Sequence, residues 1–138
     1  MSIEALRSTL GWLPITGHTI ITVENDLPIR EMIVEIVESL GHTCLQAGNA
    51  RDAIEVIQQN EVDLILLDIH MPGARGHQFL KFIRDRGILT PVIIVSGYVQ
   101  KDVLTQVKGL DVRSVLAKPI RVERLKEELD KLFAPPQL

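Results

Sequence analysis

The chain has 138 residues, of which 46% are hydrophobic and 24% charged, a composition typical of one globular domain and unlike that of a disordered chain. Its net charge of −3 provides no basic field for nucleic acid, and no apolar run approaches the roughly 20 residues of a membrane-spanning helix. The single cysteine, Cys44, excludes an internal disulfide and is expected in the core. We therefore expect a cytoplasmic domain that binds neither nucleic acid nor membrane directly.

Two kinds of segment alternate along the chain. Short runs rich in β-branched residues predict strands buried on both faces of a parallel sheet, at residues 19–23, 43–47, 62–67, 91–95 and 114–117. Apolar residues at helical spacing predict helices around residues 29–40, 53–57, 79–83, 103–107 and 122–132. Gly41 is placed to end the first helix, and Asn49 is the expected N-cap of the second.

This alternation predicts an α/β fold in which right-handed βαβ crossovers place helices on both faces of the sheet. A sheet of this kind binds its ligand beyond the carboxyl ends of its strands, where the strand order reverses. Polar residues follow four of the apolar runs at that edge: Glu24 and Asn25 after the first, then Asp68, Ser96 and Lys118 after the third, fourth and fifth.

These residue types indicate phosphoryl chemistry. Carboxylates crowded at one sheet end raise one another's pKa unless a cation joins them, and Mg²⁺ prefers oxygen ligands. Asp68 beside such a cation can act as a nucleophile toward phosphorus, while Ser96 and Lys118 can bind phosphoryl oxygens. The simpler alternatives are that Asp26 only caps the following helix and that Asp68 only begins a loop.

Four blocks of sequence resemble the receiver domain of bacterial response regulators in two-component signalling. They are ITVEND, DLILLDIHMPGARG, PVIIVSGY and LAKPI, whose Lys-Pro bond is a candidate for a cis peptide. Asp68 lies 43 residues after Asn25, Ser96 lies 28 after Asp68, and Lys118 lies 22 after Ser96. Gly76, eight residues past Asp68, stands where the family usually has a glycine.

The resemblance implies a flavodoxin-like (βα)5 three-layer sandwich with a parallel five-stranded sheet of order 2-1-3-4-5. The receiver would span residues 18–133, with an N-terminal extension at 1–17, expected to be helical, and a tail at 134–138. The extension either covers the sheet edge or makes a homodimer or partner contact. Since the remainder is too short for an output domain, we expect signalling through contact with a downstream protein that the sequence does not identify.

The same resemblance assigns roles at the strand ends. Asp68 would be the phosphoacceptor, Lys118 would contact the phosphate, and Ser96 would move toward the acyl phosphate. Glu24, Asn25, Asp68 and the backbone carbonyl of His70 would hold Mg²⁺. The donor would be a sensor histidine kinase or a histidine phosphotransfer domain. The chain would catalyse only its own phosphorylation and dephosphorylation, and so would be a signalling phosphoacceptor and not a conventional enzyme.

Two positions depart from the family. Asn25 stands where an aspartate usually ligates the metal, and its uncharged amide predicts weaker Mg²⁺ binding. The alternative alignment, in which Asn25 and Asp26 form the pair, is disfavoured because Arg30 would then fall out of step with the family. Val115 stands where many receivers have Tyr or Phe, so a ring rotation cannot report phosphorylation. Tyr98 and His70 either tune hydrolysis of the acyl phosphate or are ordinary loop residues.

These departures motivate two alternative functions. The first is a degenerate pseudo-receiver that acts only as a binding module, suggested by Asn25 and Val115. The second is a Mg²⁺-dependent phosphatase with Asp68 as nucleophile, which is disfavoured because His70 stands where such an enzyme needs a second aspartate. A histidine metal cluster is also disfavoured, since the four histidines share no ligand spacing.

Overall fold

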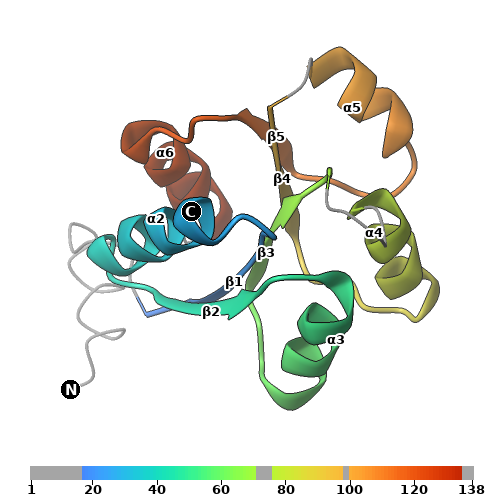
Figure 1. The fold of residues 1–138 in the computed structure, drawn as a ribbon, viewed down its shortest axis with the longest axis horizontal. Coiled ribbons are helices and arrows are strands. Elements are labelled where there is room, and N and C mark those ends of the chain that lie inside the picture. Colours follow the sequence, from blue (N-terminus) through green and yellow to red (C-terminus); the bar gives the residue numbers. More distant parts are fainter. Residues whose placement is uncertain (1–16, 71–75, 98–99, 135–138) are drawn as a thin grey trace.

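The computed structural model describes residues 17–70, 76–97 and 100–134 as an α/β domain (Figure 1). Its strands and helices alternate in the order β1 (Thr19–Val23), α2 (Leu27–Ser39), β2 (Thr43–Ala47), α3 (Ala50–Gln59), β3 (Leu64–Asp68), α4 (Gly76–Asp85), β4 (Val92–Ser96), α5 (Gln100–Gln106), β5 (Ser114–Ala117) and α6 (Val122–Phe133). All neighbouring strands are parallel, and their order is β2-β1-β3-β4-β5. The predicted fold class and strand order are confirmed.

The sheet is the middle of three layers, with helices covering both of its faces (Figure 1). Because successive strand residues point to opposite faces, each buried strand contributes to two separate cores. One core packs α3, α4 and α5 against the sheet around Phe79, and the other packs α2 and α6 around Ile33 and Leu125. Cys44 belongs to the second core, as expected for a small buried residue.

Helix boundaries follow the polar signals in the sequence. The Asp26 side chain accepts a hydrogen bond from the Ile29 N–H and caps α2, so the simple prediction for Asp26 is confirmed. Asn49 caps α3 by accepting from the Asp52 N–H, as predicted. Gly41 follows α2 with a φ of 89°, a left-handed conformation that only glycine adopts without strain, so its predicted position is also confirmed.

Two strands begin and end later than predicted. The strand predicted at 62–67 is β3 (Leu64–Asp68), and the strand predicted at 91–95 is β4 (Val92–Ser96). The strands end later because Asp68 pairs with Val95 and Ser96 pairs with Ala117, so both polar residues belong to the sheet and do not lie beyond it. The Lys118–Pro119 peptide bond is cis.

The predicted extension falls almost wholly on residues 1–16, and the tail almost wholly on 135–138, both of which lie outside the described residues. Tyr98 also lies outside them. Among the helices that the structure describes, none combines the length and the apolar character needed to cross a bilayer.

Candidate phosphoacceptor site

The parallel sheet brings four of the predicted site residues to one edge. Glu24 directly follows β1, Asp68 ends β3, Ser96 ends β4, and Lys118 directly follows β5. Because β1 and β3 are neighbours in the sheet while the chain crosses from β1 to β2 on the other side, this edge is the point where the strand order reverses. It is therefore the edge at which the fold is expected to bind a ligand.

The Lys118 ammonium joins two carboxylates that are almost fully buried. Its Nζ lies 3.0 Å from Glu24 Oε1 and 3.5 Å from Asp68 Oδ1. The Glu24 and Asp68 side chains are only 2% and 6% exposed, whereas the Lys118 side chain is 23% exposed. With water largely excluded, each charge in this group depends on the others, so the three side chains form one electrostatic unit.

Glu24 is the residue most affected by this burial. Desolvation is the largest cause that raises its pKa, to about 7, and a hydrogen bond between its protonated carboxyl group and Asp68 raises it further, while Lys118 lowers it. Its second oxygen, Oε2, is buried and has no donor among the residues that the structure describes. When both carboxylates are ionised, the group of two anions and one ammonium retains one negative charge, so the site favours binding a proton or a cation.

The oxygens at this edge suit Mg²⁺. Mg²⁺ takes oxygen ligands, and one or two carboxylates with water are a usual protein contribution. Glu24 Oε2 is a buried acceptor without a donor among the described residues, and Asp68 supplies a second carboxylate. Asn25 is exposed on the bend after Glu24, so it is not buried in the site as Glu24 is.

Asp68 is held in place by the chain that follows it. The His70 N–H donates to Asp68 Oδ1 at 3.1 Å, and the Gly76 N–H donates to the Ile69 carbonyl at 3.0 Å. A Cβ on Gly76 would lie 2.6 Å from the Ile69 Cα and 2.7 Å from the Asp68 carbonyl oxygen, which is closer than such contacts occur. Only glycine therefore allows the start of α4 to pack directly on the backbone of Asp68.

The ends of β4 and β5 are also joined. The Lys118 N–H donates to the Ser96 carbonyl at 2.8 Å, which fixes the backbone of both residues relative to each other. Ser96 is 1% exposed, so its hydroxyl lies inside the domain. The structure thus gathers Glu24, Asp68, Ser96 and Lys118 at one edge and leaves Asn25 and the side chain of His70 exposed.

Other polar residues lie elsewhere or were not identified from the sequence. His18 and His42 precede β1 and β2, and therefore lie at the opposite end of the sheet, where His18 stacks on Phe133 with ring centroids 3.8 Å apart. Arg30 also belongs to the site, since its Nη1 donates to the Glu24 carbonyl oxygen at 2.8 Å. The sequence did not indicate this contact, because the position of Arg30 on an amphipathic helix gives no signal of it.

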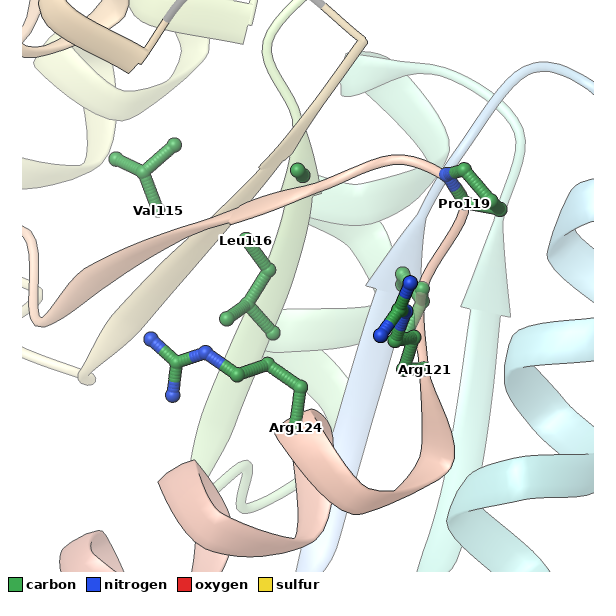
Figure 2. A pocket seen from close by; sticks show the side chains of 7 residues that line it. Val115, Leu116, Pro119, Arg121 and Arg124 are labelled. Atoms are coloured by element: carbon green, nitrogen blue, oxygen red, sulfur yellow. The ribbon is translucent and has the colours of Figure 1, made fainter.

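Two apolar pockets lie next to the strand ends. One, of about 250 Å³, is lined by Ile29, Met32, Lys118, Pro119 and Ile120. The other, of about 230 Å³, lies between β5 and the start of α6 (Figure 2). Figure 2 shows Val115 and Leu116 leaving β5 on opposite sides, with Arg121 and Arg124 near the start of α6.

Comparison with known proteins agrees with this geometry. The family described as response regulator receiver domain matches residues 20–130. The regulator of RpoS from Escherichia coli strain K12 is 34% identical over 115 residues, which are 83% of this chain and 34% of that protein. The sensor histidine kinase RcsC from Salmonella typhi is 31% identical over 131 residues, which are 91% of this chain and 14% of that protein. The chain therefore spans about a third and a seventh of these two curated relatives.

Solved structures show the same architecture. A DNA-binding response regulator of the LuxR family from Staphylococcus aureus is 26% identical with a TM-score of 0.75, covering 83% of this chain and 98% of that one. The chemotaxis protein CheY4 of Vibrio cholerae has a TM-score of 0.79 at 23% identity and covers 85% of this chain and 99% of that one. At that identity the second likeness concerns the fold alone.

Proposed function

The chain belongs to the response regulator receiver domain family, and we propose that its Asp68 accepts a phosphoryl group from a phosphohistidine. The observation that carries the proposal is that carboxylate oxygens of Glu24 and Asp68 both lie within 3.5 Å of the Lys118 ammonium nitrogen, at the point where the strand order reverses. The family is one of signalling phosphoacceptors, so the domain acts as a switch and not as a conventional enzyme. Its donor is a sensor histidine kinase or a histidine phosphotransfer domain, and we place the transfer in the cytoplasm.

In the transfer, a carboxylate oxygen of Asp68 attacks the phosphorus atom. The new P–O bond forms as the P–N bond breaks, and the donor imidazole leaves with the electron pair of that bond and takes up a proton. Lys118, which lies 3.5 Å from Asp68, is placed to balance the charge of the phosphoryl oxygens. The His70 N–H holds the Asp68 carboxylate in one orientation, which limits the directions from which phosphorus can approach.

Receiver domains bind Mg²⁺ at the phosphorylation site, and this chain has residues that can hold it. We assign Glu24 and Asp68 as the carboxylate ligands, with the amide of Asn25 and the backbone carbonyl of His70 completing the protein's share. When bound, the ion neutralises charge on the phosphoryl oxygens. Since Asn25 contributes no charge, binding is expected to be weaker than in a site with two acidic loop residues.

An apolar groove offers a surface for the donor. The pocket lined by Ile29, Met32 and Pro119 opens beside Lys118. Leu27, which lies on α2 together with Ile29 and Met32, is 51% exposed. An exposed apolar surface next to a reactive carboxylate is suited to a protein partner. We propose that the donor protein rests there while its phosphohistidine reaches Asp68.

The output is proposed to pass through the surface formed by α5, β5 and α6. A phosphoryl group adds about −1.5 to −2 units of charge at neutral pH and would draw Lys118 and Ser96 toward it. Because the Lys118 N–H is bonded to the Ser96 carbonyl, the ends of β4 and β5 respond together. A downstream protein then binds the changed surface of α5, β5 and α6, which includes the pocket in Figure 2.

The proposal is tested by incubating the protein with acetyl phosphate and MgCl2 and measuring its intact mass. One phosphoryl adduct is expected on the wild type and on Asp85→Asn, a matched change at an exposed aspartate, and none on Asp68→Asn. Absence of the adduct on the folded wild type would favour the pseudo-receiver that only binds partners. Steady turnover of phosphate monoesters would favour the phosphatase instead.

A further inference from the structure

Arg30 connects α2 to the loop that carries Glu24. Its Nη1 donates to the Glu24 carbonyl oxygen at 2.8 Å, and its Nε donates to Gln46 Oε1 at 3.3 Å. The guanidinium therefore reaches both the β1–α2 loop and the neighbouring strand β2. A planar guanidinium offers several donors in a fixed arrangement, so it can hold two acceptors at once in a defined geometry.

Glu24 is thereby fixed by its backbone on both sides. Its N–H donates to the Ala47 carbonyl at 3.0 Å, and its own carbonyl accepts from Arg30. That carbonyl belongs to the peptide group that leads into Asn25, so its direction determines where the Asn25 residue begins. Lys118 contacts only the end of the Glu24 side chain, which leaves the orientation of the loop to the backbone contacts.

The neighbouring residue Gly48 leaves space for the guanidinium. A Cβ at position 48 would lie 3.0 Å from Arg30 Nη1, which is closer than most such contacts. The backbone of Gly48 is not in the left-handed conformation that favours glycine. What favours glycine at this position is therefore the close approach of the Arg30 guanidinium, which a Cβ would crowd. The two residues form one local arrangement that serves the loop after β1.

We propose that Arg30 is a positioning residue for the cation at the phosphoacceptor site. By fixing the Glu24 carbonyl it sets the direction of the loop that presents Glu24 and Asn25 to Mg²⁺. The inference rests on the proposed function and adds to it a residue that touches neither the cation nor the phosphoryl group. Groups that orient metal ligands from behind commonly change metal affinity by about 10-fold to 100-fold when they are removed.

The sign of the effect separates positioning from simple electrostatics. Removing a positive charge next to a cation site makes the local potential more negative, so Coulomb's law alone predicts tighter Mg²⁺ binding in Arg30→Ala. Loss of loop position predicts weaker binding. The two explanations therefore give opposite changes for the same substitution.

The test is a titration of the folded protein with MgCl2, followed by the backbone amide NMR signals of residues 24–26 and 68. We expect Arg30→Ala to weaken Mg²⁺ binding by about tenfold. Gly48→Ala keeps the charge and displaces the guanidinium, so it is expected to weaken binding by a smaller factor. Arg51→Ala removes an equal charge from an exposed site on α3 and is expected to change binding by less than about twofold.

Phosphorylation by acetyl phosphate provides a second measurement. The Mg²⁺ concentration for half-maximal rate is expected to rise in Arg30→Ala, while the rate at saturating Mg²⁺ stays within about threefold of the wild type, as for a loss of binding alone. A melting curve shows whether each variant is folded, and if Arg30→Ala is not, Gly48→Ala decides the question.

Two results overturn the inference in different ways. If the wild type binds Mg²⁺ and is phosphorylated, and Arg30→Ala or the deciding Gly48→Ala binds Mg²⁺ as tightly or more tightly, only the role given to Arg30 is wrong. If the wild type shows neither Mg²⁺ binding nor phosphorylation, the proposed function itself is wrong and the role of Arg30 falls with it.

Discussion

Replacing Glu24 with glutamine should stabilise the metal-free protein at alkaline pH. The folded state raises the pKa of Glu24 from its ordinary value of 4.5 to about 7, chiefly because the carboxyl is buried. A difference of this size corresponds to about 3 kcal/mol, since one pKa unit is worth about 1.4 kcal/mol. That is the net cost of ionising Glu24 inside the domain, with the attraction of Lys118 already included. Glu24→Gln keeps the size of the side chain and removes the charge.

The sign of the pH dependence follows from which state holds the proton. Between pH 4.5 and about 7 the folded protein retains a proton on Glu24 that the unfolded chain releases, so this contribution to stability is complete below pH 4.5 and is lost as pH rises through 7. Urea unfolding in EDTA should therefore show Glu24→Gln more stable than the wild type by up to about 3 kcal/mol at pH 8 and by less than about 1 kcal/mol at pH 5. Adding MgCl2 should stabilise the wild type more than the variant.

The matched control is Glu35→Gln, which removes the same charge from an exposed position on α2 and should change stability by less than about 0.5 kcal/mol at either pH. A Glu24→Gln protein that is less stable than the wild type at pH 8 would contradict the reasoning. In that case the ion pair with Lys118 would outweigh the cost of burial, and the site would hold two stable carboxylates without a cation.

Two further substitutions test the local structure around the site, each by urea unfolding. Gly76→Ala should destabilise the domain by about 1–3 kcal/mol, because its new Cβ would lie 2.6 Å from a backbone atom of Ile69. Gly97→Ala, which meets nothing within 4 Å, should stay within about 1 kcal/mol of the wild type, and equal losses for both glycines would contradict the packing argument. Asp26→Ala should cost about 1 kcal/mol through loss of the α2 N-cap, and an unchanged unfolding curve would show that the cap contributes nothing.

The three central strands, β1, β3 and β4, could be predicted because each is buried on both faces. The edge strands β2 and β5 are only partly buried, since Gln46 and Ala117 are exposed, and their apolar residues alone indicated them. Runs such as residues 19–23 and 114–117 consist mostly of apolar and β-branched residues, and the structure places strands at those limits.

The predicted ends of β3 and β4 are wrong because Asp68 and Ser96 are polar, and a polar residue after an apolar run indicates a loop. Their membership in the sheet depends on partners in neighbouring strands, Val95 and Ala117, which the local pattern does not report.

The meeting of Glu24, Asp68 and Lys118 could be anticipated because a parallel sheet brings all its strand ends to one edge. The contacts that hold these residues in place could not. Arg30 lies 16 residues before Gln46, and it reaches the Glu24 carbonyl only because α2 packs across β1 and β2. The close approach of Gly76 to the Asp68 backbone likewise depends on how α4 packs, although its spacing from Asp68 pointed to the right residue.

The most direct test of the central claim is to locate the phosphoryl group on the chain. After reaction with acetyl phosphate and MgCl2, borohydride reduces an aspartyl phosphate to homoserine, and peptide mass spectrometry identifies the residue that has changed. The proposed function predicts homoserine at position 68 and at no other aspartate. Homoserine at another position, or an adduct that resists reduction, would show that Asp68 is not the phosphoacceptor.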